Sequence, residues 1–376
     1  MYFVHPQIKF NIENLKKIFF SFFKSPDKKI LEKVKLMFPQ KEIVFTDMGR
    51  TAFKVIIEEM GLQNSQILLP AYICDIFYPI LKKYNISPIF LDIEKETFQP
   101  NPEEIRKKIT SQTKSILICH TYGLPIDIKK IKEITGNQLV IIEDCAHSFG
   151  AKLREIYTGN FGDAAFFSLY KQFPCIRGGM TVLPKKTEIS LVKTCFSFRD
   201  FFSLLNNFEF WAYIFKKFGS KIAPKVQRKE KLEKITQINN VSLNLFLNFL
   251  KNFEETLKKR LELALFFQEE LKKLGFEVQK SENNVFCYLS ALAPKTVNRD
   301  KLVKELRKQK IFCTRIWHTP IIFNKEVQKE YNLNLSEFPN TVDVAQRIIN
   351  FPLQNYYSKG DVEKIIEVLK KTTNSL

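Results

Sequence analysis

The sequence predicts an α/β fold, with a large domain built on a mixed, mostly parallel sheet and a smaller α+β domain after it. Short apolar runs rich in β-branched residues alternate with helical patterns through the first half of the chain. These runs are apolar throughout, which is typical of strands covered by helices on both faces. With 376 residues, the chain can form a large domain over residues 1–255 and a small domain over residues 256–376.

Seven strands are expected in the large domain, and a helix follows each of the first four. The expected strands are residues 42–46, 65–70, 87–93, 115–120, 138–144, 163–169 and 178–184. The four helices are expected to begin near Thr51, Asp75, Pro102 and Asp127. Because ligands bind at the carboxyl ends of such strands, the residues just after these runs are the candidates for a functional site.

The pattern changes at residues 199–235, where aromatic residues recur at helical spacing and basic residues are frequent. We interpret this segment as a helical excursion of the large domain that covers the site or a partner subunit. The alternative is an interfacial helix on a membrane, because aromatics beside a lysine cluster suit that role. A single long helix is then expected over residues 242–273, followed by short strands and by helices near 299–309 and 360–371.

Composition narrows the possible partners and compartment. The net charge is +19, but the lysines are dispersed along the chain, which favours solvated helix faces over a nucleic-acid site. Seven cysteines without a C-x-x-C motif indicate reduced thiols in a cytoplasmic protein, and four scattered histidines argue against a metal site. We expect no signal peptide and no transmembrane helix.

Two neighbouring strand ends carry the residues that indicate a chemistry. The run at 140–144 ends on Glu143 and Asp144, and the run at 163–169 carries Ser168, with Lys171 three residues later. A pyridoxal phosphate site needs these types: a lysine for the Schiff base, an acid that keeps the pyridine nitrogen protonated, and a hydroxyl for the phosphate. Backbone amides at the helix start near Gly49, Arg50 and Thr51 could complete the phosphate cup.

Each of these residues also has a simpler interpretation. Asp144 could cap a helix, and Ser168 could cap a turn. His147 could be a core histidine, and Lys171 could be a solvated surface lysine. If Lys171 does hold the cofactor, its surroundings must lower its pKa so that it can also carry a proton.

Several segments resemble one enzyme family. They are residues 49–53, 67–74, 88–127, 140–151, 158–169 and 349–365, which stand in the same order in the DegT/DnrJ/EryC1/StrS family of aminotransferases. The resemblance runs from about residue 40 to the end of the chain. It implies fold type I, as in aspartate aminotransferase, with pyridoxal 5'-phosphate as cofactor. It also implies a homodimer that transfers an amino group, usually from glutamate, to a nucleotide-linked keto sugar for surface polysaccharides.

Carried over to this sequence, the resemblance implies roles for individual residues. The catalytic residues would be Asp144, His147 and Lys171. The cofactor-binding residues would be Gly49, Arg50, Thr51, Tyr72, Cys74, Asp144, His147, Ser168, Lys171 and Asn239. The substrate-side loop of the family corresponds to Arg315, Trp317 and His318. No metal ligand is implied.

The sequence also departs from the family pattern. The usual lysine position, five residues after the serine, is Phe173, so Lys171 is the candidate in its place. Cys74 stands where an aromatic residue stacks on the ring, and Tyr72 is the nearest substitute. The Asn-x-Arg-Met segment that enters the neighbouring subunit's site is reduced to residues 238–241, which keep Asn239.

These departures leave two further functions open. The first is a dehydratase-like reaction at the keto sugar, with the same cofactor but without the family's lysine. The second is a non-catalytic scaffold of this fold that binds an anionic membrane or nucleic acid. Visible absorbance of the protein with added cofactor separates the scaffold from both enzymes.

Overall fold

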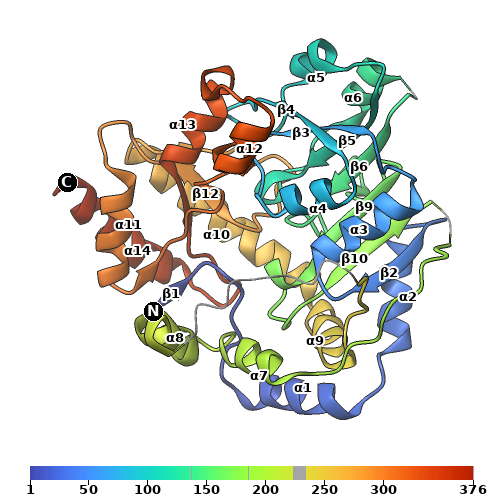
Figure 1. Cartoon of the computed structure of the whole chain (residues 1–376). Coiled ribbons are helices and arrows are strands. Elements are labelled where there is room, and N and C mark those ends of the chain that lie inside the picture. Colours follow the sequence, from blue (N-terminus) through green and yellow to red (C-terminus); the bar gives the residue numbers. More distant parts are fainter. Residues whose placement is uncertain (137, 185, 223–233, 376) are drawn as a thin grey trace.

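A seven-stranded sheet forms the centre of the large domain in the computed structural model, which describes residues 1–136, 138–184, 186–222 and 234–375 (Figure 1). The strands are β2 (Glu42–Thr46), β3 (Gln66–Pro70), β4 (Ser87–Leu91), β5 (Thr113–Cys119), β6 (Val140–Asp144), β9 (Ala164–Ser168) and β10 (Gly179–Leu183). Their order is β2-β10-β9-β6-β5-β3-β4, and β10 is antiparallel to both of its neighbours while the other pairs are parallel. The predicted mixed, mostly parallel sheet is confirmed.

Helices cover both faces of this sheet because its strands are apolar on both sides. The helices are α3 (Gly49–Glu59), α4 (Phe77–Lys83), α5 (Pro102–Lys108) and α6 (Ile128–Thr135). In β5, Leu117 packs in the cluster that contains α3 and α4, whereas Ile116 and Ile118 pack with α5 and α6. Side chains that alternate along one strand therefore enter two different cores.

The parallel pairing brings the two chemically informative strand ends together. Asp144, the last residue of β6, is aligned with Phe166 of β9, and Ser168 ends β9 two residues later. A short 3-10 turn, Leu169–Lys171, follows directly. Asp144, Ser168 and Lys171 thus belong to the same edge of the sheet, as expected for a site in this class of fold.

The C-terminal part has its own sheet and core. Its sheet has the order β11-β12-β14, formed by β11 (Glu277–Val278), β12 (Leu289–Leu292) and β14 (Ile348–Phe351). The helices are α10 (Phe253–Lys273), α11 (Arg299–Lys308), α12 (Lys325–Glu330), α13 (Pro339–Arg347) and α14 (Lys359–Asn374). The domain division at residue 255 stays a prediction.

The first residues of the chain depart from the predicted division. The strand β1 (Tyr2–Phe3) pairs in parallel with β13 (Ile311–Phe312) of the C-terminal part. The side chain of Gln354 holds the same segment, because its amide nitrogen donates to the carbonyl oxygens of Phe3 and His5 at 2.8 and 2.9 Å. The N-terminal segment therefore packs with the C-terminal half of the molecule, although we assigned it to the large domain.

The expected single helix over residues 242–273 is wrong. The chain forms α9 (Asn240–Leu250) and then α10, with a turn at Lys251 and Asn252. Phe246 of α9 packs with the large domain, as does Phe253 at the start of α10, whereas Phe267 farther along α10 packs with the C-terminal part. A continuous apolar pattern hid this change of direction, because both segments have helical spacing.

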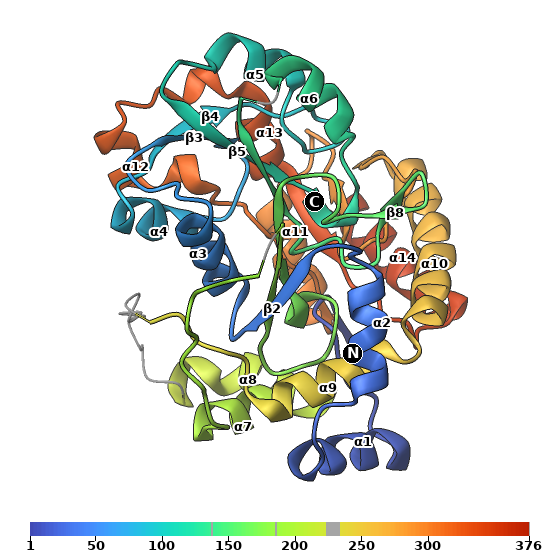
Figure 2. The ribbon, with the colours of Figure 1, turned by 90° about the vertical axis from the view of Figure 1, so that its right-hand side faces the viewer.

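Four further helices lie outside the two sheets. They are α1 (Ile12–Phe23), α2 (Lys28–Leu36), α7 (Phe198–Leu205) and α8 (Glu209–Ile222), and α1, α7 and α8 lie together at one end of the molecule (Figures 1 and 2). The helices α7 and α8 occupy the first part of the predicted excursion, whereas residues 223–233 lie outside the described residues. Within the described ranges, no helix combines the length and the apolar character needed to cross a bilayer.

Candidate active site

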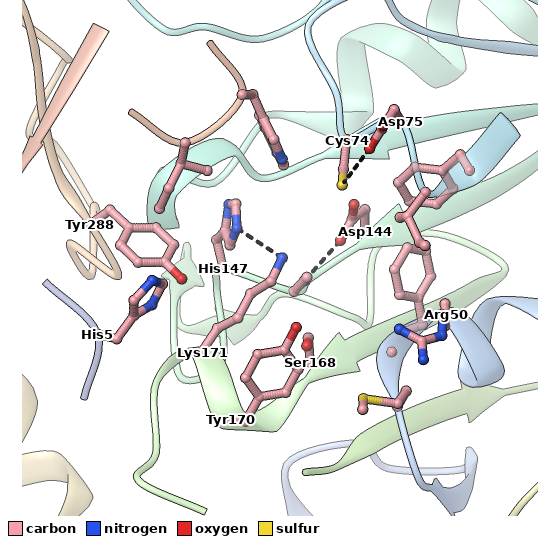
Figure 3. A pocket seen from close by; sticks show the side chains of 18 residues that line it. His5, Arg50, Cys74, Asp75, Asp144, His147, Ser168, Tyr170, Lys171 and Tyr288 are labelled. Atoms are coloured by element: carbon pink, nitrogen blue, oxygen red, sulfur yellow. Dashed lines mark hydrogen bonds between the residues drawn. The ribbon is translucent and has the colours of Figure 1, made fainter. Parts of the chain in front are cut away.

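A cavity of about 360 Å³ opens at the carboxyl ends of the sheet strands. Figure 3 shows that side chains from both halves of the chain point into it. The labelled lining residues are His5, Arg50, Cys74, Asp75, Asp144, His147, Ser168, Tyr170, Lys171 and Tyr288. A volume of this size suits a small cofactor or substrate, and this edge of the sheet is where such ligands bind.

Asp144 is a buried carboxylate at the base of the cavity. One of its oxygens, Oδ1, accepts a hydrogen bond of 2.9 Å from the backbone nitrogen of Ala146. Burial raises the pKa of Asp144, and the positive charge of Lys171 and the Ala146 amide oppose this rise. An ionised Asp144 is therefore costly in this environment until a cationic partner compensates its charge.

Lys171 extends into the same cavity, toward His147 (Figure 3). Its Nζ lies 3.1 Å from Nε2 of the His147 ring. The other ring nitrogen, Nδ1, accepts a hydrogen bond of 3.2 Å from the backbone nitrogen of Tyr122. A backbone N–H can only donate, so Nδ1 carries no proton, and in the neutral ring Nε2 carries it.

This tautomer determines the direction of the bond between the two side chains. Burial and the charge of Lys171 hold the pKa of His147 well below its usual value, so the ring is neutral. A neutral ring protonated on Nε2 donates toward Lys171, and only an uncharged amine can accept that hydrogen bond. His147 therefore favours the neutral, nucleophilic form of Lys171.

Other groups around Lys171 act in the opposite sense. The expectation that the surroundings lower the pKa of Lys171 is wrong for the cofactor-free protein. Burial alone lowers this pKa, but Tyr170, Asp144, Cys74 and Cys287 outweigh burial and raise it. The acidic neighbours of Lys171 therefore favour the ammonium ion, whereas the His147 ring favours the neutral amine. A ligand that neutralised Asp144 would remove one of the influences that favour the ammonium ion.

The start of α3 approaches Ser168 closely because Gly49 lacks a side chain. A Cβ on Gly49 would lie 3.1 Å from the Cβ of Ser168 and 3.2 Å from the carbonyl oxygen of Phe167. At Gly179, a Cβ would lie 2.2 Å from the carbonyl oxygen of Met48, which precedes the helix. Two glycines therefore let a helix N-terminus face the hydroxyl of Ser168, which is an arrangement suited to a phosphate group.

A buried pair, Glu143 and His120, supports this edge of the sheet from below. Nε2 of His120 lies 2.9 Å from the Glu143 carboxylate, and the backbone nitrogens of Gly159, Phe161 and Gly162 donate to the same carboxylate at 2.6–2.8 Å. Burial would raise the pKa of Glu143, but these hydrogen bonds outweigh it and lower the pKa.

Together with Cys145, this pair forms a group whose potential ligand atoms lie close enough to hold a metal ion. Among the described residues, His120, Glu143 and Cys145 are the one group with this arrangement. The second ring nitrogen of His120, Nδ1, accepts from the backbone nitrogen of Ile126 at 3.1 Å. The Glu143 oxygens are already occupied by the donors described above. We therefore assign the group to structural support, because its lone pairs are already used.

The structure brings together eight of the residues singled out in the sequence. Those that line the cavity are Gly49, Arg50, Cys74, Asp144, His147, Ser168, Lys171 and Trp317. The family's usual lysine position, Phe173, is buried among aromatic rings of the large-domain core. The shifted position of Lys171 therefore places an amine in the cavity, whereas residue 173 packs into the core.

Five other candidates do not line the cavity, because each has a partner elsewhere. The Tyr72 hydroxyl lies 2.7 Å from the Tyr122 hydroxyl, and the Thr51 hydroxyl donates to Asp47 at 2.6 Å. The Asn239 side chain caps α9 by accepting from the backbone nitrogen of Ser242.

The last two of these candidates belong to the expected substrate-side loop. Arg315 is bonded to Asp300, and Nδ1 of His318 lies 2.8 Å from the carbonyl oxygen of Arg315. The roles we predicted for all five residues stay predictions, without support from their positions in this chain.

The cavity residues that sequence reasoning missed include His5, Tyr170 and Tyr288. His5 comes from the N-terminal segment and contacts Tyr288 edge to face, with ring centroids 6.0 Å apart. Candidates were sought among residues that follow strands of the central sheet. Neither His5 nor Tyr288 follows such a strand, so both were missed. Tyr170 directly precedes Lys171 and could have been found from that neighbour.

Comparison with known proteins identifies the family. A sequence profile of the DegT/DnrJ/EryC1/StrS aminotransferase family matches residues 72–370. The chain belongs to this family. It is therefore a pyridoxal-phosphate-dependent aminotransferase by family, and the resemblance seen in the sequence is confirmed.

Named relatives and solved structures agree with this assignment. GDP-perosamine synthase of Escherichia coli O157:H7 is 25% identical over 329 residues, which cover 86% of this chain and 83% of that protein. The Helicobacter pylori aminotransferase PseC has a TM-score of 0.78 at 16% identity and covers both chains completely. The E. coli GDP-4-keto-6-deoxy-D-mannose-3-dehydratase has a TM-score of 0.75 at 19% identity, with 98% of this chain and 100% of that chain covered.

The residues of the cavity fit the family's cofactor. Asp144 would face a protonated ring nitrogen with a buried carboxylate, Lys171 would offer an amine, and Ser168 with the start of α3 would offer a place for a phosphate. The close approach permitted by Gly49 is the structural observation that supports the phosphate position.

Proposed function

We propose that the protein transfers an amino group to a nucleotide-linked keto sugar, with glutamate as donor, to make amino sugars for surface polysaccharides. One observation carries this proposal: the amine of Lys171 shares a cavity with the buried carboxylate of Asp144 and the hydroxyl of Ser168. An acid, a hydroxyl and an amine in one cavity are the groups that this cofactor requires. Pyridoxal phosphate, when bound, supplies an electron sink for a carbon that loses a proton.

In this proposal each residue of the chain has a defined task. Asp144 holds a proton on the ring nitrogen of the cofactor, and Ser168 with the start of α3 holds its phosphate. Lys171 would hold the cofactor and would take and return a proton at the substrate carbon. His147 favours the neutral form of the amine by directing the proton of Nε2 at Nζ, and this contact opposes the acidic neighbours that raise the pKa of Lys171.

The charge next to the cavity supports an anionic substrate. A second depression shares Met48, Arg50 and Tyr170 with the first. Its charged lining residues are three arginines and two acids, namely Arg50, Arg177, Arg199, Asp47 and Asp200. Arg177 is held by the buried Asp200, to which its Nε donates at 2.9 Å. Arginine is well suited to diphosphate groups, because its planar guanidinium donates two parallel hydrogen bonds.

A reduction experiment tests the proposal. The protein is mixed with pyridoxal phosphate, reduced with borohydride, digested, and mapped by mass spectrometry. We expect the cofactor on the peptide that contains Lys171. The variant Lys171→Ala should show no label, while Lys108→Ala, which removes a lysine bonded to Glu104 far from the cavity, should keep the label on Lys171.

The dehydratase-like reaction remains the second candidate, since the family's usual lysine position is Phe173 here. The fold likeness to a dehydratase is compatible with it. Absorbance of bound cofactor without any labelled lysine would favour this reaction and contradict amino transfer. Absence of cofactor binding would favour the non-catalytic scaffold instead.

We also propose a homodimer in the cytoplasm. All seven cysteines are free thiols, which suits a reducing compartment. Light scattering at micromolar concentration tests the dimer, and a monomer would contradict it.

A further inference from the structure

One end of the molecule has an unusual concentration of exposed apolar side chains. Of the nineteen large apolar residues that are strongly exposed in the described part of the chain, thirteen lie within residues 10–23 and 192–211. These stretches contain α1, α7 and the start of α8. Isolated exposed apolar residues are common, but a contiguous group of this size marks a surface that binds a protein, a membrane or a ligand.

Ring contacts join α1 to the segment before α7, and α7 to α8. Phe22 of α1 contacts Phe196 before α7, with ring centroids 5.0 Å apart. Phe202 of α7 contacts Phe215 of α8, with ring centroids 6.2 Å apart. Figures 1 and 2 both show α1, α7 and α8 at the same end of the molecule.

We define the aromatic face by its six most informative exposed rings, Phe19, Phe23, Phe198, Phe201, Phe210 and Trp211. Their exposure is highest at Phe198 and Phe23, at 77% and 74%. Both α1 and α7 are amphipathic, with buried sides formed by residues such as Ser21 and Leu204. Their opposite sides therefore present aromatic rings to solvent, where a soluble helix normally has polar residues.

The charge around the aromatic face distinguishes between possible partners. Residues 9–24 and 193–217 contain eight basic and three acidic residues. The acids are already engaged: Glu13 pairs with Lys17 at 2.7 Å, Asp200 pairs with Arg177, and Glu209 accepts from the Tyr356 hydroxyl at 2.7 Å. The exposed charge of this end of the molecule is therefore strongly positive, with Lys16 and Lys24 exposed on and just after α1.

This charge disfavours a second copy of the chain as the partner. A two-fold contact would bring the same basic surface against itself, and like charges across an interface oppose association. An anionic lipid surface has the opposite charge, and it accommodates aromatic side chains at the boundary between headgroups and acyl chains.

We propose that the aromatic face docks the enzyme on an anionic membrane surface. The rings of α1, α7 and α8 enter the interface, and the surrounding lysines contact lipid phosphates. Docking is peripheral, because no described helix is long and apolar enough to cross the bilayer. It does not depend on the proposed reaction, because none of the six defining rings lines the cavity.

Co-sedimentation with vesicles tests the proposal. The full chain is mixed with vesicles of phosphatidylcholine alone, or with roughly one-third phosphatidylglycerol. We expect binding to the anionic vesicles only, and weaker binding at high salt. The triple variant Phe23→Ser, Phe198→Ser, Phe210→Ser, with one change on each helix, should lower the partition coefficient by about 100-fold or more.

A matched control carries three exposed apolar changes elsewhere, Ile156→Ser, Leu261→Ser and Leu265→Ser. It should bind anionic vesicles as the unchanged protein does. Light scattering of both triple variants reports the oligomeric state. Loss of a dimer in the first variant alone would identify the aromatic face as a subunit interface and overturn the proposal.

A fluorescence measurement tests the proposal without changing the phenylalanines. The chain has two tryptophans, and Trp211 lies on the aromatic face while Trp317 lines the cavity. Brominated acyl chains in anionic vesicles should quench the emission of the unchanged protein, and Trp211→Phe should remove that quenching. Failure to bind anionic vesicles, or bound protein without quenching, would overturn the proposal.

Discussion

The Nζ atom of Lys171 lies 3.1 Å from Nε2 of His147, and the backbone N–H of Tyr122 sets the direction of that contact. The N–H donates to Nδ1, so the proton of the neutral ring sits on Nε2 and points at the amine. A histidine thereby acts on the protonation state of a lysine through its tautomer. This relationship leads to the first prediction.

Removing the ring of His147 should shift the pH dependence of covalent cofactor attachment to higher pH. The hydrogen bond from Nε2 stabilises the neutral amine, so its loss raises the pKa of Lys171 further. A shift of roughly half to one pH unit is expected for His147→Ala. The measurement is the rate of the absorbance change on adding pyridoxal phosphate, as a function of pH.

The control for this prediction is His318→Ala, because the His318 ring is bonded to the carbonyl oxygen of Arg315 outside the cavity. Its pH profile should match that of the unchanged protein. If the pH profile of His147→Ala also matched that of the unchanged protein, the His147 ring would have no influence on the Lys171 amine. Four other groups raise the pKa of Lys171 and are unchanged in both variants, namely Tyr170, Asp144, Cys74 and Cys287.

Asp144→Asn should stabilise the cofactor-free protein while it lowers activity. Burial raises the pKa of Asp144 in the folded state, so the folded protein binds the proton more tightly than the unfolded chain does. Ionisation therefore costs stability once the pH exceeds the unfolded value of 3.8, and this cost grows until the pH passes the raised pKa of the folded state. The asparagine removes this cost.

Thermal unfolding of the cofactor-free protein checks the stability part of this prediction. The melting temperature of Asp144→Asn should exceed that of the unchanged protein at neutral pH, and the difference should shrink as the pH falls. The turnover number should fall by about 100-fold to 1,000-fold, because a preorganised charge is lost. Unchanged turnover would contradict the role of Asp144 at the ring nitrogen.

His5→Ala should weaken substrate binding and leave cofactor attachment intact. His5 lines the cavity opposite the sheet and contacts Tyr288, but it is not among the groups expected to hold the cofactor. We expect KM for the keto sugar to rise by about 10-fold, as for the loss of one polar contact. Borohydride labelling of Lys171 should be unchanged, and a loss of labelling would place His5 in the cofactor site instead.

Gly179→Ala should destabilise the protein, because the added Cβ would lie 2.2 Å from the carbonyl oxygen of Met48. Overpacking of this kind costs about 1–3 kcal/mol in the free energy of unfolding, measured with urea. The matched change Gly360→Ala lies in α14, where the nearest atom is 3.7 Å away. It should be neutral or stabilise the protein by up to about 1 kcal/mol, so equal effects of the two changes would contradict the prediction.

Local patterns in the sequence determined the seven strands of the sheet and the two strand ends that carry Asp144 and Ser168. This was possible because apolar runs report strands directly, and parallel strands end at one edge. The family resemblance then connected these residues to a cofactor. The shifted Lys171 could also be proposed, because it lies only three residues beyond Ser168.

Only the tertiary structure decided the rest of the site. His5 and Tyr288 meet across most of the chain because β1 pairs with β13, and no local pattern records such a pairing. The protonation of His147 depends on the N–H of Tyr122, which comes from the end of another strand. The break between α9 and α10 likewise follows from packing against two cores, because helical spacing alone continues through it. Periodicity reports local structure, whereas the contacts that set chemistry here join distant segments.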